Sequence, residues 1–313
     1  MVGSQRYAKR AVSNFAQVGS AEIVIKSIFF AYSGDAAKGS GLRHAIKMAQ
    51  HHNARVTGVL RHGPSALEQR FGLNIPADLI EKLRQHDRDR TVEIAQRFAK
   101  IMAAGGLADR SEFVDIDLHS DGSLSEFAHA FDLIVTGVHS DAAHEAHMSA
   151  HPDFLALRSG RPVLVVPDGC EADGLADRVI VAWDGKCAAT RAIADAMPIL
   201  ADKSSGTLLS IRHTPRGTDR MVANLAGHGV TVTARTVNAK GSIAKAILAE
   251  AKAIDAKLVV MGAFEHSKLS HDPFWWRHHR ANRQSICAGL HGALSRCISK
   301  DRSRQCRAAS WSS

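Results

Sequence analysis

The stretch Val179-Ile180-Val181-Ala182-Trp183-Asp184-Gly185 decides how the rest of the chain is interpreted. Its four aliphatic or small residues have the length and composition of a buried β-strand, and the polar residue and glycine behind them indicate a turn. A stretch of the same kind, Ile28-Phe29-Phe30-Ala31-Tyr32-Ser33-Gly34, lies near the start of the chain. The sequence therefore predicts that one structural unit occurs twice.

The likeness between the two regions extends over residues 26–62 and 177–213. In both, a helical stretch follows the turn, at residues 42–51 in the first region and at about residues 188–200 in the second. A second strand is predicted next, at residues 55–60 and 207–211, because both segments are rich in β-branched or aliphatic residues.

A further pair of apolar strands is predicted at residues 132–137 and 257–262, each ending in a glycine. Continuous apolar strands are typical of parallel sheets covered by helices on both faces. The remaining predicted elements are helices at 123–130 and 242–254, shorter strands at 112–118 and 230–237, a long amphipathic helix at 77–104 and a last strand at 161–167.

Alternating strands and helices predict right-handed βαβ crossovers. We therefore expect an α/β fold of two tandem, doubly wound, five-stranded parallel-sheet domains of Rossmann-like type. The predicted boundaries are an N-terminal extension at 1–23, domain 1 at 24–168, domain 2 at 177–276 and a disordered basic tail at 277–313. Domain 2 is expected to lack its last strand, because nothing after Trp276 matches the Pro162-Val163-Leu164-Val165-Val166 run of domain 1.

Composition excludes several classes of protein. The 313 residues are 45% apolar, which suffices for two cores, yet no run approaches the roughly 20 apolar residues that span a bilayer. No secretory signal is evident, so a cytoplasmic protein without membrane contact is predicted. The five cysteines show no CxxC spacing and are interpreted as free thiols: Cys170, Cys187, Cys287, Cys297 and Cys306.

The net charge of +9 does not predict nucleic-acid binding, because it is concentrated at the two ends of the chain. Eight Lys/Arg and one acidic residue lie between Arg277 and Ser313. A body without net charge and with few aromatic residues lacks the features that bind a polyanion.

The tail suggests a frameshift near Phe274. Tryptophan has a single codon, so Trp275-Trp276 followed by a CGN arginine codon at Arg277 reads Gly-Gly after loss of one base. In that shifted frame, residues 284–293 are compatible with a strand containing Val-Pro-Val-Phe. We therefore hypothesise that residues 277–313 are a non-native, frameshifted tail.

Three segments resemble the universal stress protein family, specifically its tandem-domain bacterial members: residues 179–185 (VIVAWDG), 259–267 (VVMGAFEHS) and 159–167 (SGRPVLVVP). The resemblance covers about residues 24–274. In open parallel sheets, ligands lie beyond the carboxyl ends of the strands where strand order reverses. The resemblance implies a nucleotide crevice there in domain 2, formed by Ala182, Asp184, Met261, Gly262, His266 and Ser267.

The sequence departs from the family's nucleotide-binding motif, G-x-x-G-x9-G-[S/T]. Glu265 replaces the second glycine, and Trp275 and Trp276 stand where Gly and Ser/Thr are expected, so the crevice is interpreted as degenerate. In domain 1, Ser33 occupies the aspartate position and Val138-His139-Ser140 follows Gly137. ATP or another adenine nucleotide is therefore expected in domain 2 if in either domain.

We accordingly expect a stress-response protein that acts through ligand or partner binding without catalysis. Its two domains are expected to form an intramolecular pseudo-dimer, and a homodimer of two chains is left open as a second kind of assembly. The alternative is an ATP-dependent regulatory switch or weak ATPase using domain 2. A ligase or sulfurylase of the wider adenine-nucleotide group would need an SGGxDS-type loop, of which Tyr32-Ser33-Gly34-Asp35 is only a fragment. No metal site is predicted, because the histidine-rich segment at 139–151 is better interpreted as a solvated loop.

Overall fold

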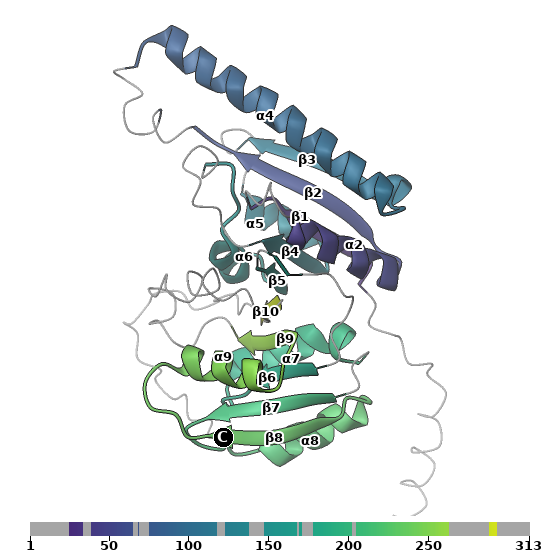
Figure 1. Cartoon of the computed structure of the whole chain (residues 1–313), viewed down its shortest axis with the longest axis vertical. Helices are drawn as coiled ribbons and strands as arrows, with labels where there is room; N and C mark the ends of the chain where they lie inside the picture. Colours follow the sequence, from purple (N-terminus) through teal and green to yellow (C-terminus); the bar gives the residue numbers. More distant parts are fainter. Residues whose placement is uncertain are drawn as a thin grey trace, which may run out of the picture.

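The computed structural model describes residues 25–33, 39–64, 68, 75–117, 123–137, 147–167, 169–170, 178–201, 205–262 and 288–292. Its described strands form one ten-stranded sheet in the order β3-β2-β1-β4-β5-β10-β9-β6-β7-β8. Figure 1 shows the two domains stacked along this sheet, with β5 and β10 at the boundary between them. The predicted fold class, two doubly wound α/β domains with parallel sheets, is confirmed.

In domain 1, neighbouring strands are all parallel. Its elements are β1 (Ser27–Ala31), α2 (Ser40–His52), β2 (Arg55–His62), α4 (Ala77–Ala104), η2 (Ala108–Arg110), β3 (Ser111–Asp117), α5 (Leu124–Phe127), η3 (Ala128–Ala130), β4 (Leu133–Gly137), α6 (Pro152–Arg158) and β5 (Val163–Val166). Helix α4 has the bounds predicted from sequence, whereas α6 was not predicted.

Domain 2 repeats the strand order of domain 1. Its elements are β6 (Arg178–Ala182), α7 (Cys187–Leu200), β7 (Ser205–Ile211), α8 (Thr218–Gly227), β8 (Val232–Val237), α9 (Ile243–Ala253), β9 (Leu258–Gly262) and β10 (Ala288–Gly292). Helix α8 is the counterpart of α4 and was not predicted.

The expectation that domain 2 lacks its last strand is wrong. Strand β10 pairs in parallel with β9 and antiparallel with β5, so it joins the two domains. It begins as far after β9 as β5 begins after β4. Open strand edges present unpaired backbone N–H and C=O groups, and an extended segment can satisfy them whatever its side chains. The remainder of the 277–313 tail, the proposed frameshift point at Phe274 and the 1–23 extension lie outside the described residues.

The core is continuous across the two domains on one face of the sheet. Helices α2, α4, α7 and α8 cover this face, and one cluster of buried side chains runs from Ile28 and Phe98 through Val166 to Val181 and Leu225. Helices α5 and α6 cover the other face of domain 1, and α9 covers that of domain 2. No helix within the described ranges is both long and apolar enough to cross a membrane.

Serine caps fix the helices on this second face. Ser123 accepts a hydrogen bond from the backbone of Ser125 at the start of α5, and Ser242 accepts one from Lys245 at the start of α9. Such caps satisfy backbone N–H groups that have no partner inside the helix. Ser123 and Ser242 are therefore the N-caps of α5 and α9.

Candidate functional site: the carboxyl edge of domain 2

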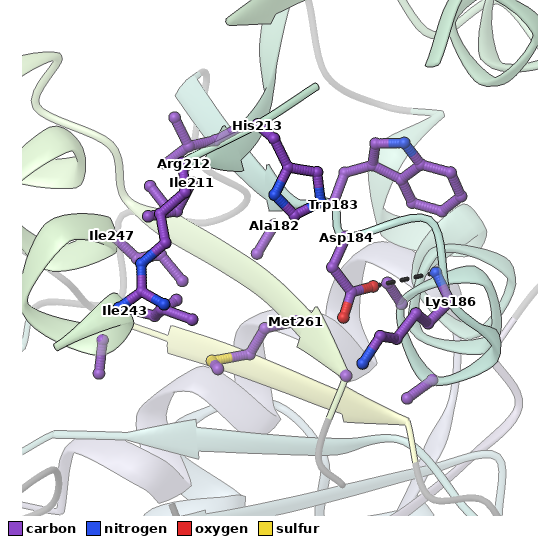
Figure 2. A pocket seen from close by; sticks show the side chains of 15 residues that line it. Ala182, Trp183, Asp184, Lys186, Ile211, Arg212, His213, Ile243, Ile247 and Met261 are labelled. Carbon is purple, nitrogen blue, oxygen red and sulfur yellow. Dashed lines mark hydrogen bonds between the residues drawn. The ribbon is translucent and has the colours of Figure 1, made fainter. Parts of the chain in front are cut away.

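A cavity of about 240 Å³ opens at the carboxyl ends of β6, β7 and β9, between the starts of α7 and α9. This is the edge at which ligands bind in doubly wound folds. Figure 2 shows its aliphatic side chains on one side and Asp184 with Lys186 on the other. Its lining comprises Ala182, Trp183, Asp184, Lys186, Ala188, Ala189, Leu209, Ile211, Arg212, His213, Ile243, Ala244, Ile247, Met261 and Gly262.

The structure brings four of the six predicted site residues to this one cavity: Ala182, Asp184, Met261 and Gly262. Ala182 and Asp184 come from the end of β6, and Met261 and Gly262 from the end of β9. His266 and Ser267 lie outside the described residues, as do Glu265, Trp275 and Trp276. What they contribute stays a prediction.

A turn after β6 holds Asp184 at the edge of the sheet. Its Oδ1 accepts a hydrogen bond from the backbone N–H of Lys186 at 3.0 Å. Gly185 has a φ of 77°, and a Cβ there would lie 2.8 Å from the Cβ of Pro215, so this turn requires glycine. In Figure 2 the second carboxylate oxygen of Asp184 faces the cavity.

Trp183 anchors the same turn from the other side of the sheet. It is 7% exposed, and its Nε1 donates a hydrogen bond to Thr218 Oγ1 at 3.2 Å. Since side chains alternate along an extended strand, burying Trp183 against α8 directs Asp184 to the opposite face. The Trp-Asp pair in the sequence thus supplies one anchor and one ligand-facing group.

Arg212 and His213 form the rim after β7 and were not predicted from sequence. Arg212 adopts a φ of 75°, which a non-glycine residue rarely adopts. Its backbone N–H donates to Val237 O at 2.8 Å and its guanidinium donates to Gly241 O at 2.8 Å, which ties the rim to the segment before α9. The sequence could have indicated Arg212 and His213 by their position, because they directly follow the second strand of the repeat.

The floor of the cavity depends on close packing of β9 against α7. A Cβ on Gly262 would lie 2.6 Å from the backbone carbonyl carbon of Ala188. Domain 1 has the corresponding approach, because a Cβ on Gly41 in α2 would lie 3.1 Å from the backbone nitrogen of Gly137. Gly262 at the end of β9 and Gly41 in α2 therefore each allow a helix to lie directly against a strand.

Residues 147–151 of domain 1 cover part of the corresponding edge of its sheet. The backbone N–H of Ala150 donates to Tyr32 O at 2.7 Å, which places residues 147–151 over the end of β1. Met148 is 1% exposed and packs against Tyr32, Leu60 and Ile94.

The histidines of this segment have other partners. His147 Nε2 lies 3.1 Å from Asp87 Oδ2 on α4, and the ring of His151 contacts that of Phe154. Burial lowers the pKa of His151, and the charge of Asp153 opposes this. His139 and His144 lie outside the described residues. Among the described residues, no group of three side chains that could hold a metal ion occurs.

A second cavity, of about 640 Å³, lies between α4 and the end of β2. Its charged side chains are paired: His62 with Asp115 at 3.1 Å, Arg84 with Glu68 at 2.5 Å, Asp87 with His147 at 3.1 Å and Arg88 with Glu81 at 2.6 Å. These pairs leave little unmatched charge to select a ligand.

Solved structures resemble this chain in fold. A universal stress protein from Archaeoglobus fulgidus superposes with a TM-score of 0.63 and 15% sequence identity, over 85% of this chain and 96% of that chain. A universal stress protein from Lactobacillus plantarum gives 0.34 and 17%, over 46% and 98% of the two chains, and one from Burkholderia pseudomallei gives 0.27 and 22%, over 37% and 94%. No protein-family profile and no curated protein sequence matches the chain. From the Archaeoglobus likeness we conclude that the chain has the fold of the universal stress proteins.

Proposed function

We propose that the chain is a stress-response protein that acts by binding an adenosine-type ligand in the crevice of domain 2, without turning it over. The likeness to the Archaeoglobus universal stress protein supports the stress-response part. The observation that carries the binding part is the cavity at the carboxyl edge, which combines an apolar wall with a single carboxylate.

The chemistry of the lining fits the parts of a nucleoside. Ile211, Ile243 and Ile247 offer an aliphatic surface for a flat base, and the free carboxylate oxygen of Asp184 is an acceptor for ribose hydroxyls. A volume of about 240 Å³ is below the roughly 300–1,000 Å³ of pockets that enclose a drug-sized ligand. We therefore expect base and ribose inside and phosphates at the rim.

Two features support binding over catalysis. The described lining contains no serine, threonine or cysteine that could act as a nucleophile. Within the described residues, Asp184 is hydrogen-bonded to the backbone of Lys186 and not to His213, so the two are not arranged as an acid–base pair.

The alternative, a nucleotide-dependent switch or weak ATPase, has one observation in its favour. Three cationic or ionisable side chains, Lys186, Arg212 and His213, line the rim where phosphates would emerge. Positive groups at that place favour a phosphorylated ligand over a bare nucleoside.

Calorimetric titration of the full chain with adenosine, AMP and ATP tests the proposal. We expect binding of all three, weakened at least tenfold in Asp184→Asn because the ribose acceptor loses its charge, which corresponds to about 1.4 kcal/mol. Asp219→Asn, a charge removal on the exposed start of α8, is the matched control and should bind as the parent does. A folded chain that binds none of the three would refute the proposal.

Release of ADP from ATP distinguishes the two functions. We expect no release above the rate without protein. Sustained release that disappears in Asp184→Asn would favour the weak ATPase.

A further inference from the structure

The described part of domain 1 contains four buried side-chain polar atoms without a hydrogen-bond partner. Ser33 Oγ, Ser149 Oγ and Arg61 Nε belong to residues at the carboxyl edge of the sheet, whereas a fourth such atom, His52 Nε2, lies at the end of α2. Ser33 is 1% exposed and Ser149 is fully buried. Buried polar groups are nearly always paired, so unpaired ones clustered together suggest a missing partner.

The strand register places the three atoms at the carboxyl edge together. Ala31 on β1 lies beside Val59 on β2, and both belong to the buried cluster beneath α5 and α6. Side chains alternate along a strand, so two residues further on Ser33 and Arg61 lie on this same face. The hydrogen bond from Ala150 to Tyr32 O brings Ser149 to the same strand ends.

His151 gives an independent indication of this placement. Burial is the main cause of the lowered pKa of His151, and the charge of Arg61 lowers it further, so the guanidinium lies close to the segment that carries Ser149. The two serines, Arg61 and His151 therefore lie at the same carboxyl edge of domain 1.

The guanidinium of Arg61 has no counter-charge within the described residues. None of the ion pairs there includes it. Burial alone lowers the pKa of Arg61, with no carboxylate raising it. A partly buried, unpaired cation is unfavourable, and a bound anion would remove that penalty.

The two domains differ at the corresponding positions. Arg61 stands where domain 2 has Ile211, and Ser33 stands where it has Asp184. An aliphatic group and a carboxylate are thus replaced by a cation and a hydroxyl. The electrostatic preference of the crevice is reversed, from a ligand that donates hydrogen bonds to one that accepts them.

We propose that Arg61, Ser33 and Ser149 form a binding site for a small oxyanion of the phosphate class in domain 1. The planar guanidinium suits such an anion, and the hydroxyls supply further donors. Met148 fills the neighbouring space, which favours a free ion over a phosphate group on a larger molecule. This site is separate from the crevice of domain 2 and does not depend on nucleotide binding there.

The test is calorimetric titration of the full chain with inorganic phosphate, at ionic strength held constant with chloride. We expect saturable 1:1 binding, at least tenfold weaker in Arg61→Gln. Arg55→Gln removes the same charge at the exposed opposite end of β2 and should bind as the parent does. Asp184→Asn should also bind as the parent does, so failure of this site and failure of the nucleotide crevice are distinguishable.

Stability gives a second readout. Without phosphate, Arg61→Gln should melt no lower than the parent, because it removes an uncompensated charge, and phosphate should raise the Tm of the parent only.

If Arg61→Gln does not fold, the double variant Ser33→Ala/Ser149→Ala replaces it, with weakened phosphate binding expected. Absence of binding by the parent at about 10 mM phosphate, or unchanged affinity in the variant, would overturn the proposal. Glycerol phosphate binding as tightly as inorganic phosphate would overturn the preference for a free ion.

Discussion

Gly262 is the residue that lets α7 lie against the end of β9. Because a Cβ there would lie 2.6 Å from the Ala188 carbonyl carbon, Gly262→Ala must move helix and strand apart. Overpacking of this kind costs about 1–3 kcal/mol. We expect a lower urea midpoint with an unchanged m-value.

Gly227→Ala is the control for this prediction. It lies at the end of α8 with open space around it, so an added methyl should be neutral or slightly stabilising. Equal midpoints for the two variants would show that the α7–β9 contact can relax without loss.

Asp195 on α7 links stability to pH. Burial raises its pKa, and the charges of Arg191 and of Arg161 in domain 1 oppose this only in part. An acid with a raised pKa in the folded state supports folding below its ordinary pKa, and that support is lost as pH rises through the raised value. The free energy of unfolding, measured in urea between about pH 4 and about pH 6, should therefore fall more steeply with pH in the parent than in Asp195→Asn. Identical slopes would contradict the assignment.

At the scale of elements, α4 is attached by the second half of its 28 residues. Its buried residues are Ile94, Phe98 and Met102, whereas Leu79 near its start is 44% exposed. Phe98 also lies against Gly58, where a Cβ would come within 2.6 Å of its ring. Phe98→Ala should cost about 3–5 kcal/mol, and Leu79→Ala less than about 0.5 kcal/mol. Chemical denaturation of both variants measures the difference, and a similar loss in both would indicate that the whole helix is docked.

The elements that were predictable from sequence have either a periodic or a continuous apolar pattern. Helix α4 shows the periodic pattern along its length, and β4, β5 and β9 are continuous apolar runs. Helix α8 was missed because only Thr218 and Leu225 are buried along it, so its apolar pattern is short. Strand β10 was missed because its alanine and glycine residues have little β-propensity. Its position is set by backbone pairing with the edge strands β5 and β9.

Some residues of the candidate site were likewise predictable from sequence and others were not. Asp184 and Gly262 were predictable because Gly262 ends an apolar strand and Asp184 follows one by two residues. Arg212 and His213 were not, because their direction depends on the positive φ of Arg212 and its bond to Gly241 O. The bond joins segments that are distant in sequence, and no local sequence pattern indicates it or the positive φ.

At the scale of the whole molecule, the frameshift hypothesis predicts that a chain with the shifted-frame ending is more stable and more soluble than this one. Replacing everything after Phe274 with the shifted-frame sequence puts a strand containing Val-Pro-Val-Phe where β10 now has Ala-Gly-Leu-His-Gly. Stronger strand propensity at the joint of the sheet should raise soluble yield and Tm. Expression of both chains side by side measures this, and equal yields and melting temperatures would count against a defect.

The position of β10 also has a consequence for how the molecule is made. The last described strand in the chain lies in the middle of the sheet, and its partner β5 is further away in sequence than the partner of any other described strand. Each set of parallel strands can form while translation continues, but the seam between them must wait until residue 292 has left the ribosome. Distant contacts also carry the largest entropy of closure. We therefore expect this seam to be the last part to assemble and the first to open, so that under stress the molecule parts into two halves before either half unfolds.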